Sequence, residues 1–178
     1  MTIQILTVPG LGGSGPQHWQ SLWEAQQTSI RRVVQADWEA PNCTEWVQQL
    51  QAEIQQAGNE IVLVAHSLGC LAVVYWALHH ATAPVKAALL VAPPDTERED
   101  FPETATGFAP VPLQRLPFPS IVVASTNDPY ITLKRVQEFA NNWGSELVSV
   151  GDCGHINAVS GLGDWPQGKV LLQRLLHP

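Results

Sequence analysis

Ile61-Val-Leu-Val-Ala-His-Ser-Leu-Gly-Cys70, followed without a break by the apolar run 71–78, is the most informative part of the sequence. The apolar residues up to Ala65 predict a strand that is buried on both faces, as in a parallel sheet. The apolar residues 68–78 predict a helix that is buried on most sides. Because only His66 and Ser67 separate the two elements, the strand passes into the helix through a very tight turn.

The turn has the pattern small-x-Ser-x-Gly, formed by Ala65, Ser67 and Gly69. This pattern is typical of a nucleophile elbow, in which a serine hydroxyl stands above the carboxyl ends of a parallel sheet. Ala65 occupies the position where the usual motif has glycine. The free N–H groups of the following helix point toward the serine, where an oxyanion would form. The alternative is that Ser67 only caps this helix, because serine is a preferred N-cap residue.

Length and composition predict one globular domain over residues 1–178, because the chain has the size of a single domain and shows no repeat or linker. The chain is 45% hydrophobic and 14% charged, which favours a substantial core and disfavours disorder. The net charge is −7, with no run of Lys or Arg. Nucleic acid and anionic membranes are therefore not expected as partners.

The N-terminal stretch Met1–Ile5 has no basic region followed by an apolar core, and no apolar run approaches the roughly 20 residues that span a bilayer. We therefore expect a cytoplasmic protein without a membrane-inserted segment. The three cysteines are Cys43, Cys70 and Cys153, an odd number at unrelated spacings. They predict neither a disulfide framework nor a metal site, and reduced thiols fit the cytosol.

Strand and helix patterns alternate along the whole chain. Strands are predicted at residues 3–8, 32–37, 61–65, 87–92, 120–125 and 146–150, and helices at 17–27, 43–58, 68–78, 131–143 and 166–176. This alternation predicts an α/β fold with about six mostly parallel strands and helices on both faces, a three-layer α/β/α sandwich. The segment 93–119 holds 7 of the 14 prolines, so we expect an irregular excursion over the site instead of a helical lid.

The loop after the first predicted strand contains Gly10, Gly12 and Gly15, which fit the GxGxxG pattern of dinucleotide-binding proteins. Asp37, at the end of the second predicted strand, would be the acid that binds a ribose. In a serine hydrolase, the same loop supplies an oxyanion N–H, here the amide of Leu11 together with that of Leu68. A third interpretation is simply a flexible loop before the helix 17–27. His18 in this helix lies close to the glycine loop and could reach the site, although a lone histidine is more often structural.

Two further polar residues follow predicted strands, Asp128 after residues 120–125 and His155 after residues 146–150. The order Ser67, Asp128, His155 along the chain is that of α/β-hydrolases and differs from those of chymotrypsin and subtilisin. A serine hydroxyl is a poor nucleophile at neutral pH, so His155 would accept its proton and Asp128 would stabilise the imidazolium. The sequence thus predicts a Ser-His-Asp triad.

Nearly the whole chain resembles the family of small serine hydrolases that includes YdeN and retinoblastoma-binding protein nine. The matching motifs are Val8–Gly10, His18-Trp19, Ala65–Gly69, Asn127–Pro129, Gly154–Asn157 and Ser160–Pro166. The resemblance implies a compact α/β-hydrolase that lacks the first two antiparallel strands and a cap domain. It also implies catalytic roles for Ser67, Asp128 and His155 and oxyanion amides at Leu11 and Leu68.

The expected activity is hydrolysis of small carboxylesters, with thioesters or amides as further substrates, through an acyl-enzyme on the triad. This chemistry needs no metal ion and no organic cofactor, and its partner is a small-molecule ester. Two alternatives stay open. One is a dinucleotide-binding oxidoreductase that uses Gly10, Gly12, Gly15 and Asp37, and the other is a protein-binding module on a hydrolase scaffold, although no protein partner is indicated.

Overall fold

Strands alternate with helices along the chain in the computed structural model, which describes residues 3–58, 60–80 and 84–177. The strands are β1 (Gln4–Val8), β2 (Ile30–Arg32), β3 (Ile61–His66), β4 (Val85–Val91), β5 (Ser120–Ala124) and β6 (Glu146–Ser149). The helices are α1 (Trp19–Gln26), α2 (Cys43–Ala57), α3 (Leu68–Ala77), α4 (Leu133–Trp143) and α5 (Pro166–Leu176), with a short 3₁₀ helix, η1 (Ala158–Ser160).

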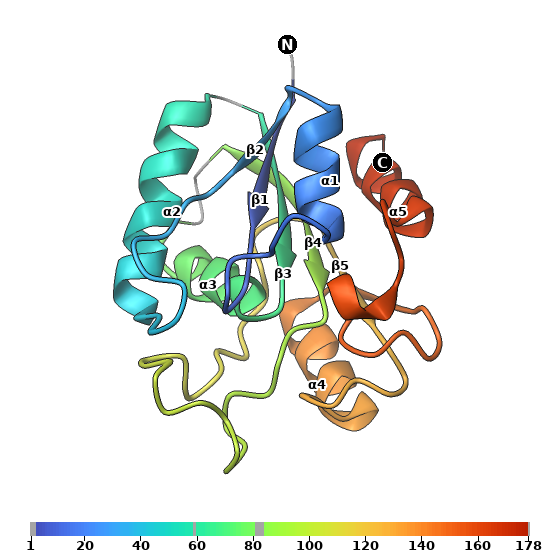
Figure 1. Ribbon diagram of the computed structural model, residues 1–178. Coiled ribbons are helices and arrows are strands. Elements are labelled where there is room, and N and C mark those ends of the chain that lie inside the picture. Colours follow the sequence, from blue (N-terminus) through green and yellow to red (C-terminus); the bar gives the residue numbers. More distant parts are fainter. Residues whose placement is uncertain (1–2, 59, 81–83, 178) are drawn as a thin grey trace.

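The six strands form one sheet in the order β2-β1-β3-β4-β5-β6, and every neighbouring pair is parallel (Figure 1). The predicted α/β class and strand number are therefore confirmed. The strand order reverses between β1 and β3. Ligands of open parallel sheets bind at the carboxyl ends of the strands beside such a reversal, which here are the ends that carry Gly10 and Ser67.

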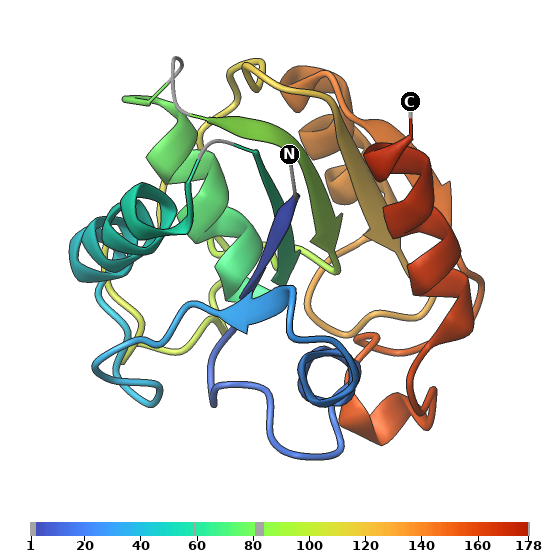
Figure 2. The same cartoon turned by 90° about the horizontal axis from the view of Figure 1, so that it is seen from above.

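Helices cover both faces of the sheet, as the view from above shows (Figure 2). One hydrophobic cluster contains side chains of α2, α3 and α4, and a second contains side chains of α1 and α5. Successive strand residues belong alternately to the two clusters: Leu63 and Ala65 to the first, Val62 and Val64 to the second. This alternation explains why the strands read as continuous apolar runs. The predicted three-layer arrangement is confirmed.

The second strand was predicted at residues 32–37, but the structure places β2 at Ile30–Arg32. The β-branched pair Val33-Val34 suggested a longer strand. Only the N–H of Val33 continues the pairing, by donating to Thr7 O at 2.9 Å, and Val34 is exposed. Asp37 lies in a turn instead, where its carboxylate accepts from the N–H groups of Glu39 and Ala40. The predicted strand was therefore misplaced.

Other boundaries differ by one or two residues, and N-cap side chains explain two of these differences. His18 is the N-cap of α1, so this helix begins at Trp19 and not at residue 17. Thr132 is the N-cap of α4, so that helix begins at Leu133 and not at residue 131. Side chains that accept hydrogen bonds from the first turn explain both shifts.

Within the described part 84–177, no helix or strand lies between β4 and β5, as the proline content predicted. This segment is nevertheless anchored to the core. Phe108, Leu116 and Phe118 are buried, and the indole Nε1–H of Trp143 donates to Pro112 O at 2.7 Å. The segment is irregular in backbone but fixed in place.

No helix among the described residues combines the length and the apolar composition that a membrane crossing requires. One sheet carries all the strands from β1 to β6, and the single domain over residues 1–178 stays a prediction.

Candidate active site

Ser67 lies in a strained turn between β3 and α3, with φ 52° and ψ −128°. Two main-chain contacts fix this turn. The N–H of Ser67 donates to Val91 O on β4 at 2.9 Å, and a Cβ on Gly69 would lie 2.2 Å from Val8 O. No side chain fits at such a separation, so position 69 requires glycine. The turn has the predicted shape of an elbow, and the methyl group of Ala65 fits inside the sheet.

The interpretation of Ser67 as a mere helix cap is wrong, because its side chain makes no capping hydrogen bond to α3. Its hydroxyl lies 2.8 Å from Nε2 of His155 instead. The Nδ1 of the same ring lies 3.0 Å and 2.9 Å from the two carboxylate oxygens of Asp128, whose side chain is 1% exposed. The structure thus brings the three predicted residues into one hydrogen-bonded chain, although their catalytic roles stay predictions.

The loops that carry Asp128 and His155 are joined to each other. The side-chain oxygen of Asn127 accepts from the N–H of Gly154 at 2.7 Å, and the Ser125 hydroxyl accepts from the N–H of Cys153 at 2.9 Å. The N–H groups just before His155 are therefore held by residues just before Asp128. This pairing sets the distance between the carboxylate and the imidazole.

The glycine loop after β1 lies against the elbow. A Cβ on Gly10 would lie 2.7 Å from Ser67 Cβ and 3.1 Å from Leu68 N, so only glycine allows this approach. Leu11 N has no hydrogen-bond acceptor among the described residues, and Leu68 N belongs to the first turn of α3. Both amides therefore belong to segments that contact Ser67 or adjoin it, and their role as oxyanion donors stays a prediction.

The arrangement that a dinucleotide site needs is not formed. Asp37 lies five residues beyond the end of β2 at Arg32, and it is exposed. The hydrogen bonds from the N–H groups of Ala40 and Glu39 lower the pKa of its carboxyl group. The carboxylate therefore stabilises the turn that follows Asp37. Gly10 of this loop allows its close approach to Ser67, whereas a Cβ on Gly12 or Gly15 would meet no atom within 4 Å.

The model of one protein family, described as serine hydrolase, matches residues 5–174. The chain belongs to the serine hydrolase family. A comparison with curated protein sequences found no match.

Solved structures agree with this assignment. A YdeN-like hydrolase from Pectobacterium atrosepticum is 31% identical, with a TM-score of 0.85 over 98% of this chain and 90% of that chain. The ydeN gene product of Bacillus subtilis is 19% identical, with a TM-score of 0.76 over 99% of this chain and 100% of that chain. The type II thioesterase BorB from the borrelidin biosynthetic cluster is 15% identical, with a TM-score of 0.67 over 98% of this chain and 93% of that chain. The first confirms the resemblance to YdeN-type hydrolases, and the other two share the fold.

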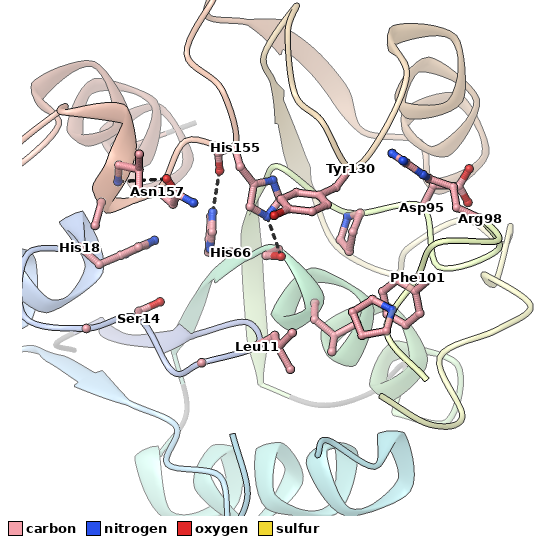
Figure 3. Close-up of a pocket in the computed structure, with 18 of the residues that line it drawn as sticks. Leu11, Ser14, His18, His66, Asp95, Arg98, Phe101, Tyr130, His155 and Asn157 are labelled. Carbon is pink, nitrogen blue, oxygen red and sulfur yellow. Dashed lines mark hydrogen bonds between the residues drawn. The ribbon is translucent and has the colours of Figure 1, made fainter. Parts of the chain in front are cut away.

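In this serine hydrolase, Ser67 lines a cavity with a volume of about 360 Å³ (Figure 3). Ser14, His18 and Asn157 lie at one end of the cavity in this view, whereas Phe101 and Arg98 lie at the other. Pro94, Asp95 and Pro102 also line the cavity, so the irregular segment between β4 and β5 forms part of its wall. This wall agrees with the predicted excursion over the site.

Exposed apolar side chains surround the mouth of the cavity. Leu11 is 43% exposed, Tyr130 52% and Val159 94%, and all three line the cavity. Sequence reasoning identified Leu11 only for its amide and missed the other two. Tyr130 lies two residues after Asp128, and its ring packs edge-on against His155 at 4.6 Å between centroids. No sequence pattern marks Val159, because its exposure depends on the placement of η1.

Two further histidines line the cavity, His18 as predicted and His66, which sequence reasoning missed. Burial lowers the pKa of His18 to about 4, with further contributions from Arg32 and His155. Burial also holds the pKa of His66 well below its usual range, with contributions from His155 and His18. Both imidazoles are therefore neutral at pH 7, and neither forms a hydrogen bond to Ser67 within the described ranges.

Proposed function

We propose that this protein hydrolyses small carboxylesters through an acyl-enzyme formed on Ser67. The observation that carries the proposal is the hydrogen-bonded chain from Ser67 through His155 to Asp128, with separations of 2.8 Å and 2.9 Å. A serine hydroxyl in contact with an imidazole, which a buried carboxylate orients, is the arrangement that activates serine for nucleophilic attack.

In the acylation step, Nε2 of His155 takes the hydroxyl proton as Ser67 Oγ attacks the carbonyl carbon of the ester. Asp128 holds the Nδ1 proton of the ring and stabilises the imidazolium that forms. The N–H groups of Leu11 and Leu68 donate to the carbonyl oxygen, which becomes negatively charged. His155 then gives its proton to the leaving alkoxide, and the C–O bond to this group breaks.

In the deacylation step, His155 accepts a proton from a water molecule, whose oxygen attacks the acyl carbon. The same two amides stabilise the second tetrahedral intermediate. His155 returns the proton to Ser67 Oγ as the ester bond to the enzyme breaks, and the carboxylic acid leaves. Every proton moves between Ser67, His155, water and the substrate, so the cycle needs no metal ion or organic cofactor.

The cavity supports a substrate of modest size that carries an apolar group. Its volume of about 360 Å³ lies near the lower end of the roughly 300–1,000 Å³ that ligand pockets occupy. The exposed side chains of Leu11, Tyr130 and Val159 offer apolar contacts at the mouth. The adjoining segment 95–103 contains five acidic residues and one arginine, which favours uncharged or cationic substrates over carboxylates.

The test is the hydrolysis of p-nitrophenyl esters from acetate to octanoate by the wild type and by Ser67→Ala. We expect turnover by the wild type and a loss of at least about 10⁴-fold in kcat for the variant, because the nucleophile is absent. The corresponding thioesters and anilides, measured alongside, define the leaving group. Turnover by a folded Ser67→Ala variant at the wild-type rate would show that Ser67 is not the nucleophile.

A further inference from the structure

Ile156, the residue after His155, has an unfavourable backbone conformation. Its φ is +50°, and its side chain is fully buried. A β-branched residue rarely adopts a positive φ, and such a conformation persists where the surrounding structure fixes it. The main chain beside the imidazole is therefore held by specific contacts.

Two buried side chains make these contacts, on consecutive carbonyl groups. Nε2–H of His66 donates to His155 O at 2.9 Å (Figure 3), and Nε1–H of Trp19 donates to Ile156 O at 2.8 Å. His66 is 5% exposed and Trp19 is 1% exposed. Because a carbonyl oxygen only accepts, Nε2 of His66 must carry the proton, and this fixes the tautomer of the ring.

The position of His66 gives its hydrogen bond a particular consequence. His66 is joined by a peptide bond to Ser67, so its donation to His155 O ties the main chain of the nucleophile to that of the base. The direct bond between Ser67 and His155 must break in each catalytic cycle, when the imidazole turns its proton toward the leaving group. The bond from His66 involves no reacting atom, so no step of the proposed cycle requires it to break.

We propose that His66 is a positioning residue that keeps His155 aligned with Ser67 while the hydrogen bond between Ser67 and His155 is broken. Trp19 is the second donor, and we call the two hydrogen bonds to His155 O and Ile156 O the brace. The inference rests on the proposed role of His155 as base. The opposite side of the loop is already held, because Asn127 and Ser125 accept from the N–H groups of Gly154 and Cys153. The brace supplies the matching donors on the carbonyl side.

A matched pair of variants separates the hydrogen bond from the bulk of the ring. In His66→Gln, the side-chain amide N–H can occupy the place of Nε2–H, whereas in His66→Asn the shorter side chain cannot reach His155 O. We expect His66→Asn to lower kcat by about 10²-fold with KM within about threefold, because a displacement of about 1 Å costs this much. His66→Gln should recover kcat to within about tenfold of the wild type. Trp19→Phe, which keeps an aromatic ring without the donor, should fall between the two.

The second readout does not depend on activity. Histidine-selective ¹⁵N NMR measures how fast the Nδ1 proton of His155, which faces Asp128, exchanges with water. We expect exchange in His66→Asn to be at least about tenfold faster than in the wild type and in His66→Gln, because the ring is no longer held against the carboxylate.

The outcomes separate this proposal from the proposed function. Equal kcat per folded molecule in the wild type and His66→Asn, with equal proton exchange, would overturn the brace and leave the hydrolase untouched. A wild type without turnover would overturn the proposed function. The exchange rates of the Nδ1 proton of His155 would then be the only test of the brace. Faster exchange in His66→Asn would support it, and equal exchange in all three proteins would contradict it.

Discussion

Ser67 lies in a turn whose shape depends on main-chain contacts, whereas His155 lies in a loop held by side chains from three other parts of the chain. At the elbow, Gly69 packs against the carbonyl of Val8, and Gly10 packs against Ser67. Around His155, the contacts come from the Ser125–Asn127 stretch, from the end of β3 and from α1. A short sequence motif can therefore describe the elbow, but no motif describes the support of the base.

The difference also predicts how each region responds to substitution. At the elbow, one added methyl group meets main-chain atoms that cannot move away. Around His155, each side chain contributes one hydrogen bond of several, so that removal of one should loosen the imidazole by degrees. The first, second and fourth predictions below test these responses, and the third tests the buried histidines between the two regions.

The largest expected effect lies on the base side, at Asp128. Replacement by Asn keeps the size of this buried side chain but removes the charge that orients the imidazole. We expect Asp128→Asn to lower kcat by about 10⁴-fold, because the ring takes the wrong tautomer. Ester hydrolysis measures the loss, and a melting temperature near that of the wild type shows that the fold is intact. A variant with nearly full turnover would mean that the acid is another residue.

The next effect lies on the elbow side, at Gly10. In Gly10→Ala the new Cβ would lie 2.7 Å from Ser67 Cβ, so the glycine loop must shift and carry the amide of Leu11 away from the oxyanion. We expect kcat to fall by about 10²–10³-fold. Gly15→Ala is the matched control, because a Cβ there meets no atom within 4 Å. Equal activity of the two variants would show that the glycine loop does not contribute to the oxyanion site.

The third effect concerns stability in acid. Because the pKa of His18 falls from its ordinary value of 6.5 to about 4 on folding, the unfolded chain binds its proton first as the pH decreases. The buried, neutral His18 contributes about 3 kcal/mol to the free energy of unfolding. This contribution is complete above pH 6.5 and is lost as the pH falls toward 4. The lowered pKa of His66 acts in the same direction.

Urea unfolding at pH 7 and pH 4 measures this loss. In His18→Asn the shorter side chain still offers an oxygen to the N–H of Gln20, as Nδ1 of His18 does, but it does not titrate. We expect the difference in unfolding free energy between the two pH values to be smaller in this variant. An unchanged difference would show that His18 is not buried in its neutral form.

The smallest expected effect is at Asn127, on the loop that carries the acid. Asn127→Ala removes the acceptor for the N–H of Gly154 and should lower kcat by about tenfold, since the other supports of His155 remain. Asn127→Asp keeps the acceptor oxygen and should stay within about threefold of the wild type. Kinetics of both variants, each corrected for the folded fraction, provide the comparison. A loss as large as that of Asp128→Asn would mean that the loop has no further support.

The fold was predictable because its signals are local. The apolar runs of β3 and α3 and the small residues around Ser67 defined the centre of the sheet, and Asp128 and His155 followed from their places after the predicted strands 120–125 and 146–150. β2 was misplaced because Val33-Val34 has strand propensity, while only Val33 pairs with β1. Propensity describes a single residue, whereas pairing depends on where the neighbouring strand ends.

The support of the site was not predictable, because it depends on side chains that meet only after folding. His66 occupies a variable position of the elbow motif, where nothing in the pattern indicates a donor to His155 O. Trp19 reads as a core residue, and it is one, but its indole N–H also reaches Ile156 O. Val159 at the cavity mouth is one apolar residue among many in the sequence.

The central claim is that Ser67 is an activated nucleophile, and the most direct test is labelling with a fluorophosphonate probe. Mass spectrometry of the intact protein and of its peptides would measure both the extent and the place of labelling in the wild type, Ser67→Ala and Asp128→Asn. We predict complete labelling of the wild type on Ser67, none on Ser67→Ala, and slow labelling of Asp128→Asn. A folded wild type that stays unlabelled, or that carries the label on another residue, would contradict the claim and favour a binding function for this scaffold.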